Sequence, residues 1–204
     1  MQLHLMDLRR DGRALSCLQL GCGDSVLAEE LYDDLGGCCQ IVNIDWSPTV
    51  IKKMQNRAPS LQRHGLSYKR MDARELEFQR NQFDVVIDKG TVDAILCDAQ
   101  GDHHLHTINM EVSRVLKPGG IYFVISYREP TARTSHYNQP CFNWAMKASH
   151  ELCQTHRRNF CYLYVMQAHA MKSTQVLSHS QEVSCQEEEE EEEEVEEESL
   201  LDID

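Results

Sequence analysis

With 204 residues the chain is long enough for one domain rather than two, and it contains no run of 18 apolar residues that would cross a membrane. Its formal net charge of −13 resides at the C-terminus, since residues 172–204 hold 14 acidic residues and one lysine, whereas residues 1–171 hold 19 acidic and 19 basic residues. A neutral domain with an acidic tail lacks the basic footprint that nucleic-acid binding requires, so nucleic acid is not an expected partner.

The cysteines and the N-terminus exclude further classes. The nine cysteines are scattered, odd in number and without a Cys-x-x-Cys spacing, so neither a zinc site nor a disulfide framework is expected. The first 13 residues are too short and too charged for a secretory signal. These features indicate a reducing compartment, and we expect a cytoplasmic protein that binds neither a membrane nor a metal.

The segment from Ala14 to Trp46 organises the rest of the chain. Its apolar residues predict a strand over 15–20 that stops at the turn Gly21-Cys22-Gly23. Two glycines two positions apart let the backbone turn sharply and leave no side chain between it and a ligand. A helix with apolar residues at helical spacing follows over 26–35, and Asp24 or Ser25 is its expected cap.

A second strand over 41–44 places Asp45 at its carboxyl end. An acid about 20 residues beyond the glycines is the position at which nucleotide-binding folds hold a ribose diol. A dinucleotide is disfavoured, because Val26 occupies the position of a third glycine and Asp24 would repel a phosphate at the helix start. A ligand with a ribose and no phosphate fits better, and S-adenosylmethionine is the common one.

The alternation of strands and helices continues. Ser47-Pro48 predicts a helix start, with serine as the cap and proline in the first turn. Strands are expected over 66–71 and 83–87, and they end at Asp72-Ala73 and at Asp88-Lys89-Gly90-Thr91. A helix-like segment over 92–97 and an expected loop over 98–106 come next.

The second half of the chain is predicted to contain an amphipathic helix over 107–117, a strand over 121–126, a long polar loop over 127–140 and two final β-like segments over 142–148 and 160–167. Residues 172–204 are expected to be disordered, because their dense glutamates repel one another. The predicted organisation is a short N-terminal segment (1–13), a domain over 14–171 and an acidic tail over 172–204.

Five strands that alternate with helices imply a doubly wound α/β fold, whose ligand binds at the carboxyl ends of the strands. Asp45, Asp72 and Asp88 each end a different strand, so we expect them to converge on one crevice beside Gly21 and Gly23. The alternative for Asp72 and Asp88 is that they cap the helices that follow.

Several stretches resemble class I S-adenosylmethionine-dependent methyltransferases, namely LQLGCGD, IVNIDWS, MDAREL, FDVVIDKGTVDAIL and RVLKPGG. DKGTVDA is the most specific, because it is similar to a sequence after strand four in the branch that methylates lysine on translation elongation factor 1-alpha. The resemblance covers roughly residues 15–168. It implies a Rossmann-like seven-stranded sheet, mostly parallel with a terminal antiparallel pair, and a protein-lysine methyltransferase that acts on elongation factor 1-alpha or a similar protein.

The resemblance also implies roles for individual residues. The turn Gly21-Cys22-Gly23 would pass under the methionine part of S-adenosylmethionine, and Asp45 would take both ribose hydroxyls with Trp46 beside the adenine. Asp72 would accept from the adenine amino group while Ala73 offers its backbone. On the substrate side, the implied residues are Asp88, next to the methionyl end, Lys89, Gly90 and Thr91 at the mouth, and His136 and Tyr137 in the long loop.

Asp88 is the expected catalytic residue. A lysine acceptor must lose its proton before methyl transfer, since its reference pKa is about 10.4. We expect Asp88 to orient the amine rather than act as a base, because a carboxylate with an ordinary pKa is a poor base at neutral pH.

Other interpretations compete with this one. Only 14 residues precede Leu15 and none is aromatic, whereas the family carries an aromatic-rich segment there, which favours a catalytically silent or truncated methyltransferase-like binding protein. A small-molecule methyltransferase is a less favoured alternative, and a nicotinamide-dependent dehydrogenase is the least favoured. The acidic tail either docks a basic partner or only solubilises the chain. His103, His104 and His106 are expected in a solvated loop rather than at a metal.

Overall fold

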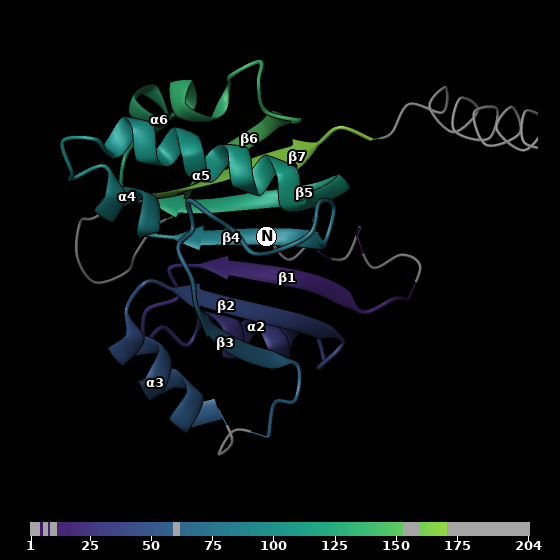
Figure 1. Cartoon of the computed structure of the whole chain (residues 1–204). Coiled ribbons are helices and arrows are strands. Elements are labelled where there is room, and N and C mark those ends of the chain that lie inside the picture. The colour runs from purple at the N-terminus through teal and green to yellow at the C-terminus, as the bar shows by residue number, and fades with distance from the viewer. Residues whose placement is uncertain (1–4, 6–7, 9–11, 59–61, 153–159, 171–204) are drawn as a thin grey trace, which may run out of the picture. The chain divides into compact units, whose positions relative to one another are not determined.

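The computed structural model describes residues 5, 8, 12–58, 62–152 and 160–170. Within these residues, seven strands form one sheet in the order β3-β2-β1-β4-β5-β7-β6 (Figure 1). The strands are β1 (Leu15–Leu20), β2 (Cys39–Asp45), β3 (Leu66–Arg70), β4 (Phe83–Lys89), β5 (Leu116–Ser126), β6 (Trp144–Leu152) and β7 (Cys161–Ala168). All neighbours pair in parallel except β7, which is antiparallel to β5 and to β6. The predicted seven-stranded, doubly wound sheet with a terminal antiparallel pair is confirmed.

Helices cover both faces of this sheet. They are α2 (Leu27–Asp34), α3 (Pro48–Arg57), α4 (Thr91–Ile95), α5 (Gly101–Val115) and α6 (Pro130–Tyr137). On one face, the buried side of α5 packs with α4 and α6 against residues such as Leu18 of β1 and Tyr122 of β5. On the other face, α2 packs against the alternate strand positions, among them Cys17 and Phe123. Figure 1 shows α5 and α2 on opposite sides of the strands.

The starts of α3 and α2 were both predicted with a capping side chain. The Ser47 hydroxyl accepts from Val50 N at 3.3 Å and Pro48 occupies the first turn of α3, so the predicted helix start is confirmed. Helix α2 begins at Leu27 with Val26 as its N-cap residue and without a side-chain cap, although Ser25 Oγ accepts from Leu27 N at 3.2 Å. Asp24 is not a cap, because its exposed carboxylate pairs with Lys53 Nζ at 2.7 Å instead.

Two predicted loops are wrong. Residues 101–106 are the first turns of α5, because Leu105 continues the buried stripe of Ile108 and Val112 by one turn. Most of the segment 127–140 is α6, which begins with Pro130 in its first turn, the signal that also marks the start of α3. The predicted tail, over 172–204, lies outside the described residues.

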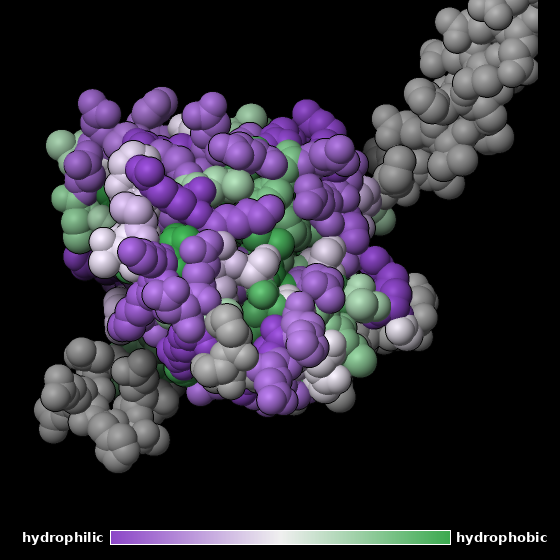
Figure 2. Space-filling model, turned by 60° about the horizontal axis from the view of Figure 1, so that its bottom comes forward, coloured by the Kyte–Doolittle hydropathy of each residue, from purple (hydrophilic) through white to green (hydrophobic). Residues whose placement is uncertain are grey.

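The outer surface is mixed in polarity. On the face that Figure 2 presents, hydrophilic residues surround a band of apolar ones. No helix in the described part of the chain is long and apolar enough to cross a membrane.

Candidate functional site

A pocket of about 510 Å³ opens at the carboxyl ends of β1 to β4, a size typical of small-molecule sites. Its walls come from the turn after β1, the end of β2, the segment after β3, the start of α4 and one side of α5. The lining residues are Gly21, Ile44, Asp45, Trp46, Met71, Asp72, Ala73, Arg74, Lys89, Gly90, Thr91, Ala94, Ile95, His104 and Ile108. Of the five residues predicted to converge on one crevice, Gly21, Asp45 and Asp72 line this pocket, whereas Gly23 and Asp88 do not.

Gly21 lets β1 and α4 approach closely beneath the pocket. Its φ is +51°, and a Cβ at this position would lie 2.2 Å from Thr91 Oγ1, so no side chain fits. The Thr91 hydroxyl donates to the Leu20 carbonyl at 3.1 Å. Thr91 thus joins the end of β1 to the start of α4, and the glycine makes this contact possible.

Asp45 is held in place by backbone amides. Its Oδ2 accepts from Gly23 N at 2.9 Å and its Oδ1 accepts from Ser47 N at 2.8 Å. Each carboxylate oxygen keeps a further lone pair, and the residue lines the pocket. An acceptor fixed in this way suits a ligand that offers two adjacent hydroxyl groups.

Asp72 is engaged by Arg74 on the pocket wall. The Arg74 guanidinium donates to Asp72 Oδ1 from Nε at 3.0 Å and to Oδ2 from Nη2 at 2.7 Å, while its Nη1 lies 3.2 Å from His104 Nε2. The hydrogen bonds from Arg74 lower the pKa of Asp72 below its ordinary value. The carboxylate is therefore ionised at neutral pH, and a ligand amino group would share it with Arg74.

Trp46 presents an exposed aromatic surface at the pocket rim. Its side chain is 65% exposed, and the Arg70 guanidinium lies 5.6 Å from its ring centroid, within the range of a cation–π contact. An exposed indole beside a nucleotide-sized pocket is suited to contact a flat ring.

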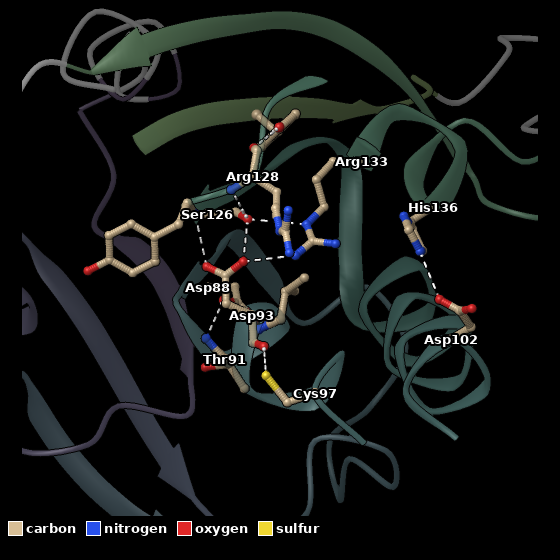
Figure 3. A network of polar contacts seen from close by, with 12 residues as sticks. Asp88, Thr91, Asp93, Cys97, Asp102, Ser126, Arg128, Arg133 and His136 are labelled. Atoms are coloured by element: carbon tan, nitrogen blue, oxygen red, sulfur yellow. Dashed lines mark hydrogen bonds and ion pairs between the residues drawn. The ribbon is translucent and has the colours of Figure 1, made fainter. Parts of the chain in front are cut away.

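Asp88 does not line the pocket. Its side chain is fully buried, and Oδ1 accepts from Thr91 N at 3.0 Å and from Val92 N at 3.3 Å, as the dashed line to Thr91 in Figure 3 indicates. Oδ2 has no partner among the described residues. Burial raises the pKa of Asp88 to about 7, so the expectation of an ordinary pKa is wrong.

Asp88 caps the helix that follows it, which was the alternative to a place in the crevice. Its carboxylate holds the N-terminus of α4, directly below the pocket-lining turn of Lys89, Gly90 and Thr91. Gly90 adopts the left-handed conformation there, with φ of +81°. A direct contact between Asp88 and an acceptor amine stays a prediction, and the contacts support an indirect action through the turn.

Four other predicted site residues lie away from the pocket lining. Gly23 contributes its N–H to Asp45, and Cys22 is buried beside Ile51 and Met54, where burial, more than Asp45, raises its pKa to about 12. His136 Nε2 lies 3.0 Å from Asp102 Oδ1 on α5. Tyr137 is fully buried in the core, so its predicted place in a substrate-facing loop is wrong.

The three histidines of the predicted loop, His103, His104 and His106, lie on α5. Within the described residues, no group of three or more His, Cys, Asp or Glu side chains is placed to hold a metal ion. His104 instead lines the pocket and His106 Nδ1 lies 3.0 Å from Gln139 Oε1. Because the segment is helical, successive histidines point in different directions around the axis.

Arg74 and His104 line the pocket although the sequence did not indicate them as site residues. The same holds for a polar network in which Asp93 of α4 contacts Ser126 at the end of β5 and Arg133 of α6 (Figure 3). A signal existed for Asp93, since it belongs to the DKGTVDA stretch, but none for Arg133 in a predicted loop.

A mostly parallel sheet in this order, with an antiparallel β7 and a pocket at the carboxyl ends of its strands, defines the class I methyltransferase fold. A family model described as "Methyltransferase domain" matches residues 11–198. The chain belongs to this methyltransferase family, and the resemblance seen in its motifs is confirmed.

Two groups of relatives are similar in sequence. The chain is 38% identical over 141 residues to EEF1A lysine methyltransferase 4 of Mus musculus, in a match that covers 64% of this chain and 52% of that protein. It is 43% identical over 111 residues to the eEF1A lysine and N-terminal methyltransferase of Homo sapiens, in a match that covers 53% of this chain and 16% of that protein. The chain thus spans about half the length of the first relative and less of the second.

Solved structures match the fold at low identity. A methyltransferase from Methanosarcina mazei described as SAM-dependent superposes with a TM-score of 0.60 at 17% identity, over 78% of this chain and 94% of that one. The [4+2]-cyclase SpnF also superposes with a TM-score of 0.60, at 16% identity, over 83% of this chain and 81% of that one. These likenesses establish the fold alone, because the fold hosts more than one reaction.

Proposed function

We propose that this chain is a cytoplasmic S-adenosylmethionine-dependent methyltransferase whose acceptor is a lysine of translation elongation factor 1-alpha or a similar protein. The observation that carries the proposal is the pocket in which Asp45 is held by two backbone amides beside the glycine turn. The names of the two relatives described above support the lysine acceptor and the protein substrate.

The residues of the pocket fit this cofactor. Asp45 offers two fixed acceptors to a ribose diol, and Trp46, Asp72 and Ala73 line the side where an adenine would lie. The positive side chains of the lining are Arg74, which is paired with Asp72, and Lys89. An uncharged nucleoside therefore suits the pocket better than a pyrophosphate.

When bound, the cofactor supplies a methyl group on a positively charged sulfur that is already activated. The protein then has to hold the acceptor amine close and in line, which supplies on the order of 7–11 kcal/mol of rate enhancement. We assign this task to the turn of Lys89, Gly90 and Thr91, and its support is that Asp88 fixes the turn through Thr91 N. The acceptor amine must lose its proton before the methyl group is transferred, and the proton passes to water.

A transfer assay with radiolabelled S-adenosylmethionine and purified elongation factor 1-alpha tests the proposal. We expect label on the elongation factor, lost when its lysines are blocked by prior acetylation. Asp45→Ala should abolish labelling, whereas Asp24→Ala, which removes a nearby exposed carboxylate, should retain it. A wild-type chain that binds the cofactor but labels small amines instead would contradict the protein acceptor.

The acidic residues at the C-terminus suggest how a basic partner would be attracted. Residues 187–194 are eight consecutive glutamates, and such a run accelerates association with a cationic protein at low ionic strength. Deletion of residues 182–204 should slow association with elongation factor 1-alpha at low salt and have little effect at high salt. If the full chain and the shortened chain associate at equal rates at low salt, the tail does not attract the partner and acts only as a solubilising segment.

A further inference from the structure

Three elements meet at the carboxylate of Asp93. This residue lies on α4, four residues after the pocket-lining Lys89. Its Oδ1 accepts from Ser126 Oγ at 2.6 Å and from Arg133 Nη2 at 2.9 Å, and its Oδ2 accepts from Tyr127 N at 3.0 Å (Figure 3). One carboxylate therefore joins α4, the end of β5 and α6.

The network is closed and shielded from water. Arg133 Nε donates to Ser126 Oγ at 3.2 Å, so the guanidinium and the hydroxyl contact each other as well as Asp93. The side chains of Arg133 and Asp93 are only 9% and 19% exposed. A buried ion pair is a poor source of stability compared with apolar packing, and its best-attested use is to fix one arrangement of the elements it joins.

Helix α6 is held at its other end too. His136 Nε2 lies 3.0 Å from Asp102 Oδ1, and Asn109 Nδ2 donates to the His136 carbonyl at 3.0 Å. Both partners are on α5, which also lines the pocket with His104 and Ile108. The Asp93–Arg133 pair thus supplies the link from α6 to α4, while His136 supplies the link to α5.

The backbone fixed by Asp93 carries an exposed aromatic ring, and this backbone leads away from the strand that borders the pocket-lining turn. Lys89 pairs with Ile125 in the β4–β5 register, and Gly90 N donates to the Ile125 carbonyl at 3.0 Å. Tyr127 is therefore two residues beyond a residue that contacts the pocket-lining turn. Its side chain is 59% exposed although its N–H is bound to Asp93.

We propose that Asp93 and Arg133 are positioning residues that hold Tyr127 where it can contact the acceptor lysine. This proposal rests on the proposed function. The exposed aromatic face of Tyr127 suits the aliphatic stem and the cationic head of a lysine side chain before it is deprotonated. Loss of the pair displaces the ring without removing any group from the cofactor pocket.

The test compares Asp93→Asn, Arg133→Met and Tyr127→Ala with the wild-type full chain. Each should bind S-adenosylmethionine with an unchanged dissociation constant, raise KM for elongation factor 1-alpha and lower kcat/KM by about 10- to 100-fold, as expected for a misplaced contact. Tyr127→Phe should restore the wild-type KM. The control is Glu111→Gln, which breaks a partly buried carboxylate–arginine pair with Arg114 outside this network and should leave KM unchanged.

Hydrogen exchange of the Tyr127 amide tests the positioning role independently of which substrate the protein uses. Asp93→Asn should accelerate this exchange and Glu111→Gln should not, whether or not the elongation factor is the acceptor. If the wild-type chain binds cofactor and labels no elongation factor, the proposed substrate is wrong and the exchange comparison decides on the positioning. Unchanged exchange, unchanged KM in a folded Asp93→Asn variant, or weakened cofactor binding would each overturn the proposal.

Discussion

Gly23 donates its backbone N–H to Oδ2 of Asp45 at 2.9 Å, so the glycine turn after β1 and the acid that ends β2 form one unit. Ser47 N binds the other carboxylate oxygen at 2.8 Å. The acceptor pair is therefore oriented before any ligand arrives, which reduces the ordering cost of binding.

Alanine substitutions at the two glycines of this turn distinguish the loss of stability from backbone strain from the loss caused by a steric clash. Gly21 and Gly23 both have positive φ, +51° and +54°, but a Cβ would clash with Thr91 only at Gly21. We expect Gly23→Ala to lower the free energy of unfolding by about 1–2 kcal/mol through backbone strain. Gly21→Ala should lose a further ~1–3 kcal/mol through overpacking, as measured by chemical denaturation.

Removal of the Thr91 side chain provides the control for that comparison. In the double variant with Gly21→Ala and Thr91→Ala, the two nearest atoms, Oγ1 and Cγ2, are absent. The alanine at 21 should then cost less than it does in the wild-type background. If Gly21→Ala costs no more than Gly23→Ala, the close approach of β1 and α4 does not limit this position.

Asp88 makes stability fall as the pH rises. Burial raises its folded-state pKa from 3.8 to about 7, so between these values the folded protein binds more protons than the unfolded one. The free energy of unfolding then decreases by up to about 1.4 kcal/mol per pH unit for this one group. Asp72 and Asp84 have lowered pKa values and lose their stabilising contribution only below about pH 4, in a separate window.

Asp88→Asn tests this dependence. Asparagine keeps an oxygen for Thr91 N and Val92 N but carries no charge, so the variant should be more stable than wild type at pH 7.5 and similar to it at pH 4.5. Denaturation series at both pH values measure the difference, with the exposed Asp34→Asn as control. Parallel curves for wild type and Asp88→Asn would contradict a buried carboxylate that ionises near neutrality.

The two tryptophans report on different parts of the protein. Trp46 is exposed at the pocket rim, whereas Trp144 is buried and its Nε1 donates to the Tyr137 carbonyl at 2.9 Å. We expect S-adenosylmethionine to change the emission of wild type and to leave that of Trp46→Phe unchanged. A ligand-dependent change that persists in Trp46→Phe would place the response at the core tryptophan instead.

Much of the fold could be predicted because its strands are short apolar runs that end at chemically distinctive residues. The β1 strand, the Ser47-Pro48 helix start and the placement of Asp45 and Asp72 at one pocket follow from local patterns. The antiparallel order of β7 and β6 followed from the family resemblance, since periodicity alone does not give strand direction.

The errors have physical causes. Helix α6 buries only Arg133 and Tyr137 and has no apolar stripe, so its amphipathic pattern is weak and its proline start was the available signal. Asp88 belongs to a motif with a polar end, but whether its carboxylate faces a pocket or the helix N-terminus depends on the tertiary position of Thr91 and Val92. Pairings such as Arg74 with His104 join residues 30 apart and leave no local trace.

The most direct test of the account is calorimetric titration of the full chain with S-adenosylmethionine, S-adenosylhomocysteine and NAD. We predict saturable one-site binding of the first two, no binding of NAD, and loss of binding in a folded Asp45→Ala variant. Asp24→Ala should bind as wild type does, because its carboxylate pairs with Lys53 outside the pocket lining. Absence of binding by the folded wild-type chain, or equal binding by Asp45→Ala, would contradict the assignment of this pocket to the cofactor.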